Sequence, residues 1–95
     1  MKTVAEHRIK VLIVDDVAET RENLRKLLSF GQGFVVAGEA ENGKEAVALA
    51  KRVRPDVILM DINMPVMGGI EATEMISVEV PTSTVIIISV QGEQE

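Results

Sequence analysis

The sequence has 95 residues, of which 46% are hydrophobic and 26% charged, and this composition is typical of one small folded domain. A net charge of −5 argues against a partner such as nucleic acid or an anionic membrane surface. The absence of cysteine excludes disulfides and thiolate chemistry, and the single histidine, His7, excludes a histidine metal cluster. No stretch resembles a signal peptide or a membrane span, so we expect a cytoplasmic protein.

Short apolar runs alternate with stretches of helical periodicity after a polar N-terminal tail, residues 1–8. The runs cover residues 11–14, 34–37, 57–60 and 85–88. Each is apolar on both faces, as strands in the centre of a parallel sheet are.

The first helix is predicted between the first two runs. Leu24, Leu27 and Leu28 form its apolar face, and charged residues such as Arg21 lie mostly on the opposite face. A glycine cluster that begins at Gly31 ends this helix.

The second helix is predicted to begin at Asn42, because Glu45 follows three residues later, as in a capping box. It ends before Pro55, and a third, less regular helix covers about residues 69–78. The resulting order β-α-β-α-β-α-β predicts right-handed crossovers and a parallel sheet with helices on both faces.

Polar side chains follow three of the four predicted strands: Asp15 and Asp16, then Asp61, then Ser89. Sites in open α/β sheets lie at the carboxyl ends of strands. If the first and third strands are neighbours, three carboxylates converge on one pocket, where each disfavours the charge of the others. A hard divalent cation such as Mg²⁺ relieves that repulsion, because it prefers oxygen ligands.

Each of these residues also has a structural interpretation. Asp15 and Asp16 can cap a helix, Asp61 can begin a turn ahead of Asn63, and Ser89 can be an ordinary turn residue. If both groups of aspartates had only structural roles, their position at the ends of two apolar strands would be a coincidence. We therefore favour the metal site.

Three blocks of sequence resemble the receiver domain of bacterial response regulators. They are Lys-Val-Leu-Ile-Val-Asp-Asp at residues 10–16, Met-Asp-Ile-Asn-Met-Pro at residues 60–65, and Val-Ile-Ile-Ile-Ser at residues 85–89. The blocks stand in the family's order and at its spacing. The resemblance implies a flavodoxin-like α/β fold, a doubly wound parallel sheet with strand order 2-1-3-4.

The resemblance implies that Asp61 accepts a phosphoryl group from a partner histidine kinase in the presence of Mg²⁺. Asp15, Asp16, Asp61 and the backbone carbonyl of Asn63 would hold the ion, and Ser89 would hydrogen-bond the phosphoryl group and act as a switch. A metal that bridges carboxylate and phosphoryl oxygens screens the repulsion between them. We accordingly expect a phosphoacceptor and not an enzyme.

The resemblance also implies that parts of the family's domain are missing. The family's fifth strand carries a lysine that pairs with the phosphoryl group and an aromatic switch residue, and the sequence stops at Glu95 before either. Residues 9–95 are therefore expected to form an incomplete receiver, truncated before strand 5 and lacking most of helix 4, strand 5 and helix 5. We expect phosphotransfer to be impaired in such a chain.

Two other functions stay open. The first is an assembly or dimerisation module derived from a receiver, in which the uncharged, apolar edge of the strand at residues 85–88 pairs with a second copy. In support of such a role, the tail at residues 90–95 resembles receivers fused to ATPases, so an ATPase or another output domain is an expected partner. The second is a phosphohydrolase of the haloacid dehalogenase type, which needs Asp-x-Asp where this chain has adjacent Asp15 and Asp16.

Overall fold

The computed structural model describes residues 8–88, and seven elements follow one another along them. Their bounds are β1 Ile9–Val14, α1 Ala18–Ser29, β2 Phe34–Ala40, α2 Gly43–Val53, β3 Val57–Met60, α3 Gly69–Glu79 and β4 Thr84–Ile87. The predicted tail lies outside the described residues except for Arg8, and so does Ser89. None of the described helices has the length and apolar character needed to cross a bilayer.

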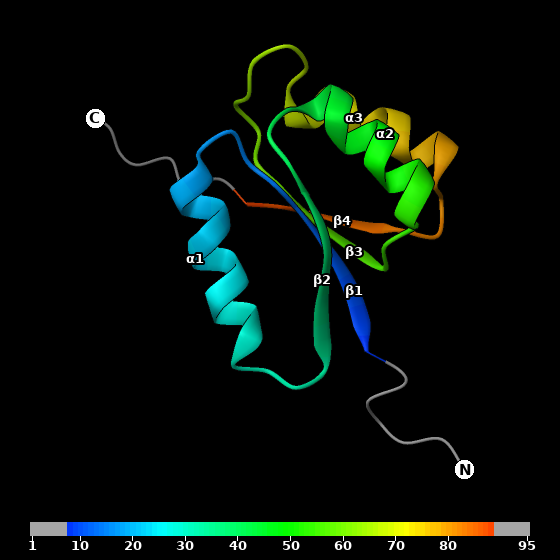
Figure 1. Ribbon diagram of the computed structural model, residues 1–95. Coiled ribbons are helices and arrows are strands. Elements are labelled where there is room, and N and C mark those ends of the chain that lie inside the picture. The colour runs from blue at the N-terminus through cyan, green and yellow to red at the C-terminus, as the bar shows by residue number, and fades with distance from the viewer. Residues whose placement is uncertain (1–7, 89–95) are drawn as a thin grey trace.

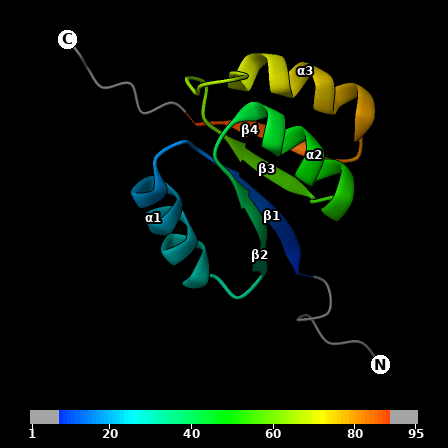
Figure 2. The ribbon, with the colours of Figure 1, turned by 45° about the horizontal axis from the view of Figure 1, so that its top comes forward.

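The four strands form one parallel sheet in the order β2-β1-β3-β4. Figure 1 shows α1 on one face of this sheet and α2 with α3 on the other, and the turned view of Figure 2 shows the same three layers. The predicted fold class, a flavodoxin-like doubly wound α/β sheet with strand order 2-1-3-4, is confirmed.

The core lies mainly between the sheet and the pair α2 and α3. Its buried residues come from the sheet, from the two helices and from the end of α3, and they are Leu12, Val14, Ala40, Ala46, Val47, Ala50, Ile58, Met60, Ala72, Ile76 and Val80. Small alanines on both helices let the helix backbones approach the larger strand side chains closely. Removal of this apolar surface from water is the main stabilising contribution to the fold.

The α1 face of the sheet is less completely covered. No residue of α1 is buried, and Leu27 from its predicted apolar face is 64% exposed. Ile86 of β4, which lies beside Leu59 of β3 in the register, is 47% exposed. The face under α2 and α3 is therefore the more completely covered one, and the α1 face is more open, especially toward β4.

Three of the four strands have boundaries that differ from the sequence prediction. β1 begins at Ile9 instead of residue 11, and β4 ends at Ile87 instead of residue 88. β2 continues to Ala40, beyond the predicted end at residue 37, because Gly38 does not end the strand. The strand shifts register beside Gly38, whose missing side chain makes room for Leu49 of α2. β4 begins at Thr84, one residue earlier than predicted, because Thr84 already pairs with Val57.

The predicted cap of α2 is confirmed with one change. The Asn42 side chain accepts a hydrogen bond from the backbone N–H of Glu45 at 2.9 Å. The Glu45 carboxylate accepts in return from the backbone N–H of Glu41 at 3.1 Å, one residue before the position that a standard capping box uses.

Two glycines allow close backbone approaches around the connection between β3 and α3. The Gly43 N–H donates to the carbonyl oxygen of Met67 at 2.8 Å, and the Gly69 N–H donates to that of Ile62 at 2.8 Å. A methyl group added at Gly69 would overlap the carbonyl oxygen of Asp61. Because the clash is with backbone, no side-chain rotation can relieve it.

We predict that Gly69→Ala lowers the free energy of unfolding by about 1–3 kcal/mol or more, the usual cost of overpacking. Gly33→Ala is the matched control, because nothing lies within 4 Å of the added methyl group there. The control should change the free energy of unfolding by less than about 0.5 kcal/mol. Urea unfolding followed by circular dichroism measures both variants, and equal effects would contradict the close approach at Asp61.

Candidate metal centre

The pairing of β1 with β3 brings the aspartates together. Val14 and Met60 are partners in the parallel register, so Asp15 and Asp61 leave the sheet side by side at its carboxyl edge. The Asp61 N–H donates to the carbonyl oxygen of Val14 at 3.0 Å, and the Asp15 N–H donates to that of Ala40 at 3.1 Å. The main chains of both residues are therefore held by the sheet itself.

Asp15, Asp16 and Asp61 form a cluster in which one carboxylate oxygen from each lies within 4.8 Å of the others. Asp15 is 9% exposed, Asp61 is partly buried and Asp16 is exposed. One oxygen of Asp15, Oδ1, accepts the backbone N–H of Val17 at 2.8 Å, which orients the carboxylate. Within residues 8–88, none of the three aspartates forms an ion pair with a lysine or arginine.

The charge of the cluster perturbs Asp61. Burial raises the pKa of its carboxyl group, and the negative charges of Asp15 and Asp16 raise it further. Hydrogen bonds from the backbone N–H groups of Ile62 and Asn63 act in the opposite direction. The ionised form of Asp61 is thus less favoured in the folded chain than in the unfolded chain. A cation bound at the cluster would offset this effect.

The donor set suits a hard divalent cation. All three side-chain donors are carboxylate oxygens, which Mg²⁺ prefers, and they come from adjacent strand ends with one ligand exposed toward solvent. Asn63 lies two residues after Asp61 on the same connection and is exposed. Its predicted role as a carbonyl ligand, like that of Ser89 as a phosphoryl contact, stays a prediction.

Sequence reasoning missed one contact at this centre. It placed Arg21 mostly on the polar side of its helix, but the Arg21 side chain is only 17% exposed and its Nη1 donates to the carbonyl oxygen of Asp15 at 2.6 Å. The Nε of Arg21 donates to Glu39 of β2 at 3.1 Å. No helical or strand periodicity signals this contact, since it joins three elements.

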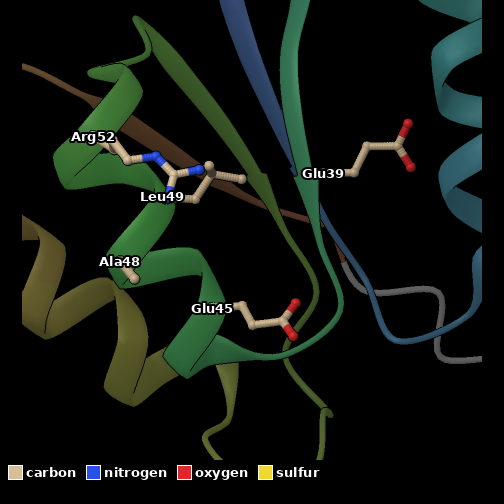
Figure 3. A pocket seen from close by; sticks show the side chains of 5 residues that line it. All are labelled: Glu39, Glu45, Ala48, Leu49 and Arg52. Carbon is tan, nitrogen blue, oxygen red and sulfur yellow. The ribbon is translucent and has the colours of Figure 1, made fainter.

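A separate hollow of about 250 Å³ lies between β2 and α2. Figure 3 shows the side chains that line it, Glu39, Glu45, Ala48, Leu49 and Arg52. None of the three clustered aspartates lines this hollow. The candidate metal site predicted from the sequence is therefore the cluster of aspartates and not this hollow.

The raised pKa of Asp61 predicts a stability that depends on pH in the absence of metal. A raised pKa means that the folded chain holds the proton more tightly than the unfolded chain. The cost to stability is therefore absent below the ordinary value of 3.8, grows as the pH rises toward the folded-state pKa, and is complete above it.

Asp61→Asn removes this cost, so the variant should be more stable than the parent at neutral pH and equally stable near pH ~3. Thermal unfolding with EDTA across this range measures the difference. Glu74→Gln, which removes an exposed carboxylate of α3 outside the cluster, is the control and should show no such trend. A parent chain as stable as Asp61→Asn at neutral pH would contradict the electrostatic account.

Comparison of the sequence and the structure with known proteins identifies the family. The response regulator receiver domain matches residues 11–95. The chemotaxis protein CheY of Thermotoga maritima is 45% identical over 85 residues, which are 90% of this chain and 70% of that protein. The response regulator domain of CheB from the same organism superposes with a TM-score of 0.85 at 40% identity, over 92% of this chain and 64% of that one.

A further similar structure is the complex of CheX with CheY, BeF3 and Mg²⁺ from Borrelia burgdorferi. It has a TM-score of 0.83 at 30% identity, over 97% of this chain and 75% of that one. The chain spans about two fifths of the length of the first curated relatives that it matches. The family match includes most of β1, every other described strand and helix, and all three clustered aspartates. The chain belongs to the response regulator receiver domain family.

Proposed function

We propose that this domain binds Mg²⁺ at Asp15, Asp16, Asp61 and the carbonyl of Asn63, and accepts a phosphoryl group on Asp61 from a histidine kinase. The observation that carries the proposal is the cluster itself: three carboxylates from two neighbouring strand ends, without an ion-pair partner among the described residues. The CheY complex with Mg²⁺ and BeF3 supports it, because that protein is similar over 97% of this chain.

The geometry suits transfer to an aspartate. A carboxylate oxygen of Asp61 would attack the phosphorus atom as the bond to the donor's histidine nitrogen breaks, which yields an acyl phosphate and free histidine. Bound Mg²⁺ supplies the charge that screens Asp61 from the phosphoryl oxygens. Asp15 and Asp16 would hold the ion, and Ser89 would hydrogen-bond the transferred group.

The proposed role is that of a phosphoacceptor and not of an enzyme. Several relatives are protein-glutamate methylesterases, but this chain spans only 27% and 22% of two of them. An ATPase or another output domain that responds to phosphorylation is part of the proposal, and so is a cytoplasmic location.

Binding of Mg²⁺ tests the first half of the proposal. Calorimetry should detect one site in the parent chain, and Asp16→Asn should weaken binding by roughly 10-fold because it removes a charged ligand. Glu74→Gln removes the same charge outside the cluster and should leave the affinity unchanged. An affinity that Asp16→Asn does not alter would place the ion elsewhere.

Labelling with acetyl phosphate tests the second half. We predict an acyl phosphate that requires Mg²⁺ and is lost in Asp61→Asn. It should reach only a small fraction of the protein, because within residues 8–88 no lysine or arginine forms an ion pair with the cluster and could stabilise charge on the phosphoryl oxygens. Mass spectrometry measures the fraction. Stoichiometric labelling would contradict only the expectation that phosphotransfer is impaired. No labelling would favour an assembly module. Rapid turnover of the donor would favour a phosphohydrolase.

The open edge of the sheet favours a second candidate, association of two copies through β4. Within residues 8–88, β4 pairs with β3 alone, and its Ile86 and Ile87 are 47% and 38% exposed. Unpaired apolar strand edges without charge or proline tend to pair with another strand. An antiparallel pair of β4 strands around a twofold axis would cover both edges at once.

Light scattering at low concentration tests this association. The parent chain should be a dimer, and Ile86→Lys should make it a monomer because charge blocks strand pairing. Val78→Lys is the control: Val78 is 78% exposed on α3 and is not part of β4, so its replacement should leave the dimer intact. A parent chain that is a folded monomer by circular dichroism, or a loosely folded aggregate, would contradict association through β4.

A further inference from the structure

Arg21 of α1 connects the metal centre to the sheet through two hydrogen bonds. Its Nη1 donates to the carbonyl oxygen of Asp15 at 2.6 Å, and its Nε donates to Oε1 of Glu39 at 3.1 Å. The side chains of Arg21 and Glu39 are 17% and 28% exposed. Charge-assisted hydrogen bonds in a partly buried setting are stronger and more directional than exposed ones.

Glu39 is itself held from a second direction. Its other oxygen, Oε2, accepts from Nη1 of Arg25, one turn further along α1, at 2.5 Å. Figure 3 shows the Glu39 carboxylate projecting from β2 away from Glu45 and Leu49 of α2. Both oxygens of Glu39 are thus engaged by α1, and the carboxylate is a fixed anchor for the Arg21 guanidinium.

Asp15, the first of the two acids on the segment after β1, is restrained at its carbonyl, its carboxylate and its N–H. The carbonyl of Asp15 is held by Arg21, its carboxylate by the backbone N–H of Val17 at 2.8 Å, and its own N–H by the carbonyl of Ala40 at 3.1 Å. Of these three partners of Asp15, only Arg21 contributes a side chain. The contact from Arg21 is therefore the one that a substitution can remove without changing Asp15 or the main chain.

We propose that Arg21 is a positioning residue for the metal centre, which acts by holding the Asp15 carbonyl so that Asp15 and Asp16 present their carboxylates together with Asp61. The inference rests on the proposed Mg²⁺ site. An arginine is needed because its planar fork reaches two acceptors in different directions, whereas a lysine ammonium is a single point charge. Groups that orient metal ligands commonly change metal affinity by 10-fold or more when they are replaced.

A purely structural role for Arg21, as a tie between α1 and β2, predicts a different result. Loss of such a tie would lower stability without metal and leave the affinity of the folded chain for Mg²⁺ unchanged. Loss of a positioning residue weakens Mg²⁺ binding in the folded chain, and excess Mg²⁺ restores the bound state. The two roles are therefore distinguished by affinity measured at a temperature where each variant is folded.

The experiment compares Mg²⁺ titrations of the parent chain, Arg21→Lys and Arg52→Lys, followed by NMR of the backbone amides of residues 15–17. Arg21→Lys should bind Mg²⁺ roughly 10-fold more weakly and reach the parent's spectrum at saturation. Arg52→Lys is the matched control on exposed α2 surface and should bind like the parent. Acetyl phosphate labelling of Arg21→Lys should need more Mg²⁺ but reach the parent's rate at saturation.

Glu39→Gln provides a second variant if Arg21→Lys does not fold. It releases the anchor of Arg21 without touching Asp15, and it should weaken Mg²⁺ binding in the same direction. Parent-like affinity in the folded variant would overturn the positioning role while leaving the proposed function in place. A parent chain that does not bind Mg²⁺ would overturn the proposed function and this inference with it.

Discussion

The adjacency of β1 and β3 in a parallel sheet is the constraint on which the rest of this domain depends. Their register pairs Val14 with Met60, and the next residue of each strand is an aspartate. The hydrogen bonds of the sheet therefore force like charges together. Burial raises the pKa of Asp61, and the charges of Asp15 and Asp16 raise it further. The three carboxylates therefore lie close together without a bound cation. A cation would offset the repulsion between their charges.

The groups around the cluster are arranged to keep that geometry. Gly69 permits α3 to begin directly against the carbonyl of Asp61, and Gly43 lets the start of α2 hydrogen-bond to the connection that follows β3. Arg21 holds the other side of the cluster through Asp15. Backbone contacts thus fix Asp61, whereas a charged side chain restrains the segment with the two remaining acids.

The two faces of the sheet differ in a way that bears on function. The face under α2 and α3 contains the main core, which includes Val14 and Met60, the last residues of β1 and β3 before the clustered aspartates. The other face supports α1, which buries no residue and contacts the sheet partly through the pairs of Arg21 and Arg25 with Glu39. Through Arg21, these polar contacts of α1 reach Asp15 of the acid cluster.

Local patterns in the sequence were sufficient for the elements, their order and the candidate acids. Apolar runs and helical spacing depend only on near neighbours, and the order of strands and helices restricts the topology to a few parallel sheets. The continuation of β2 past Gly38 could not be predicted, because the glycine is required by Leu49 of α2 and not by its own strand. The tertiary structure alone decided that Asp15, Asp16 and Asp61 lie within 4.8 Å and that Arg21 bridges Asp15 to Glu39. Such contacts join residues far apart in the chain, and only the packing of the elements against one another determines which side chains meet.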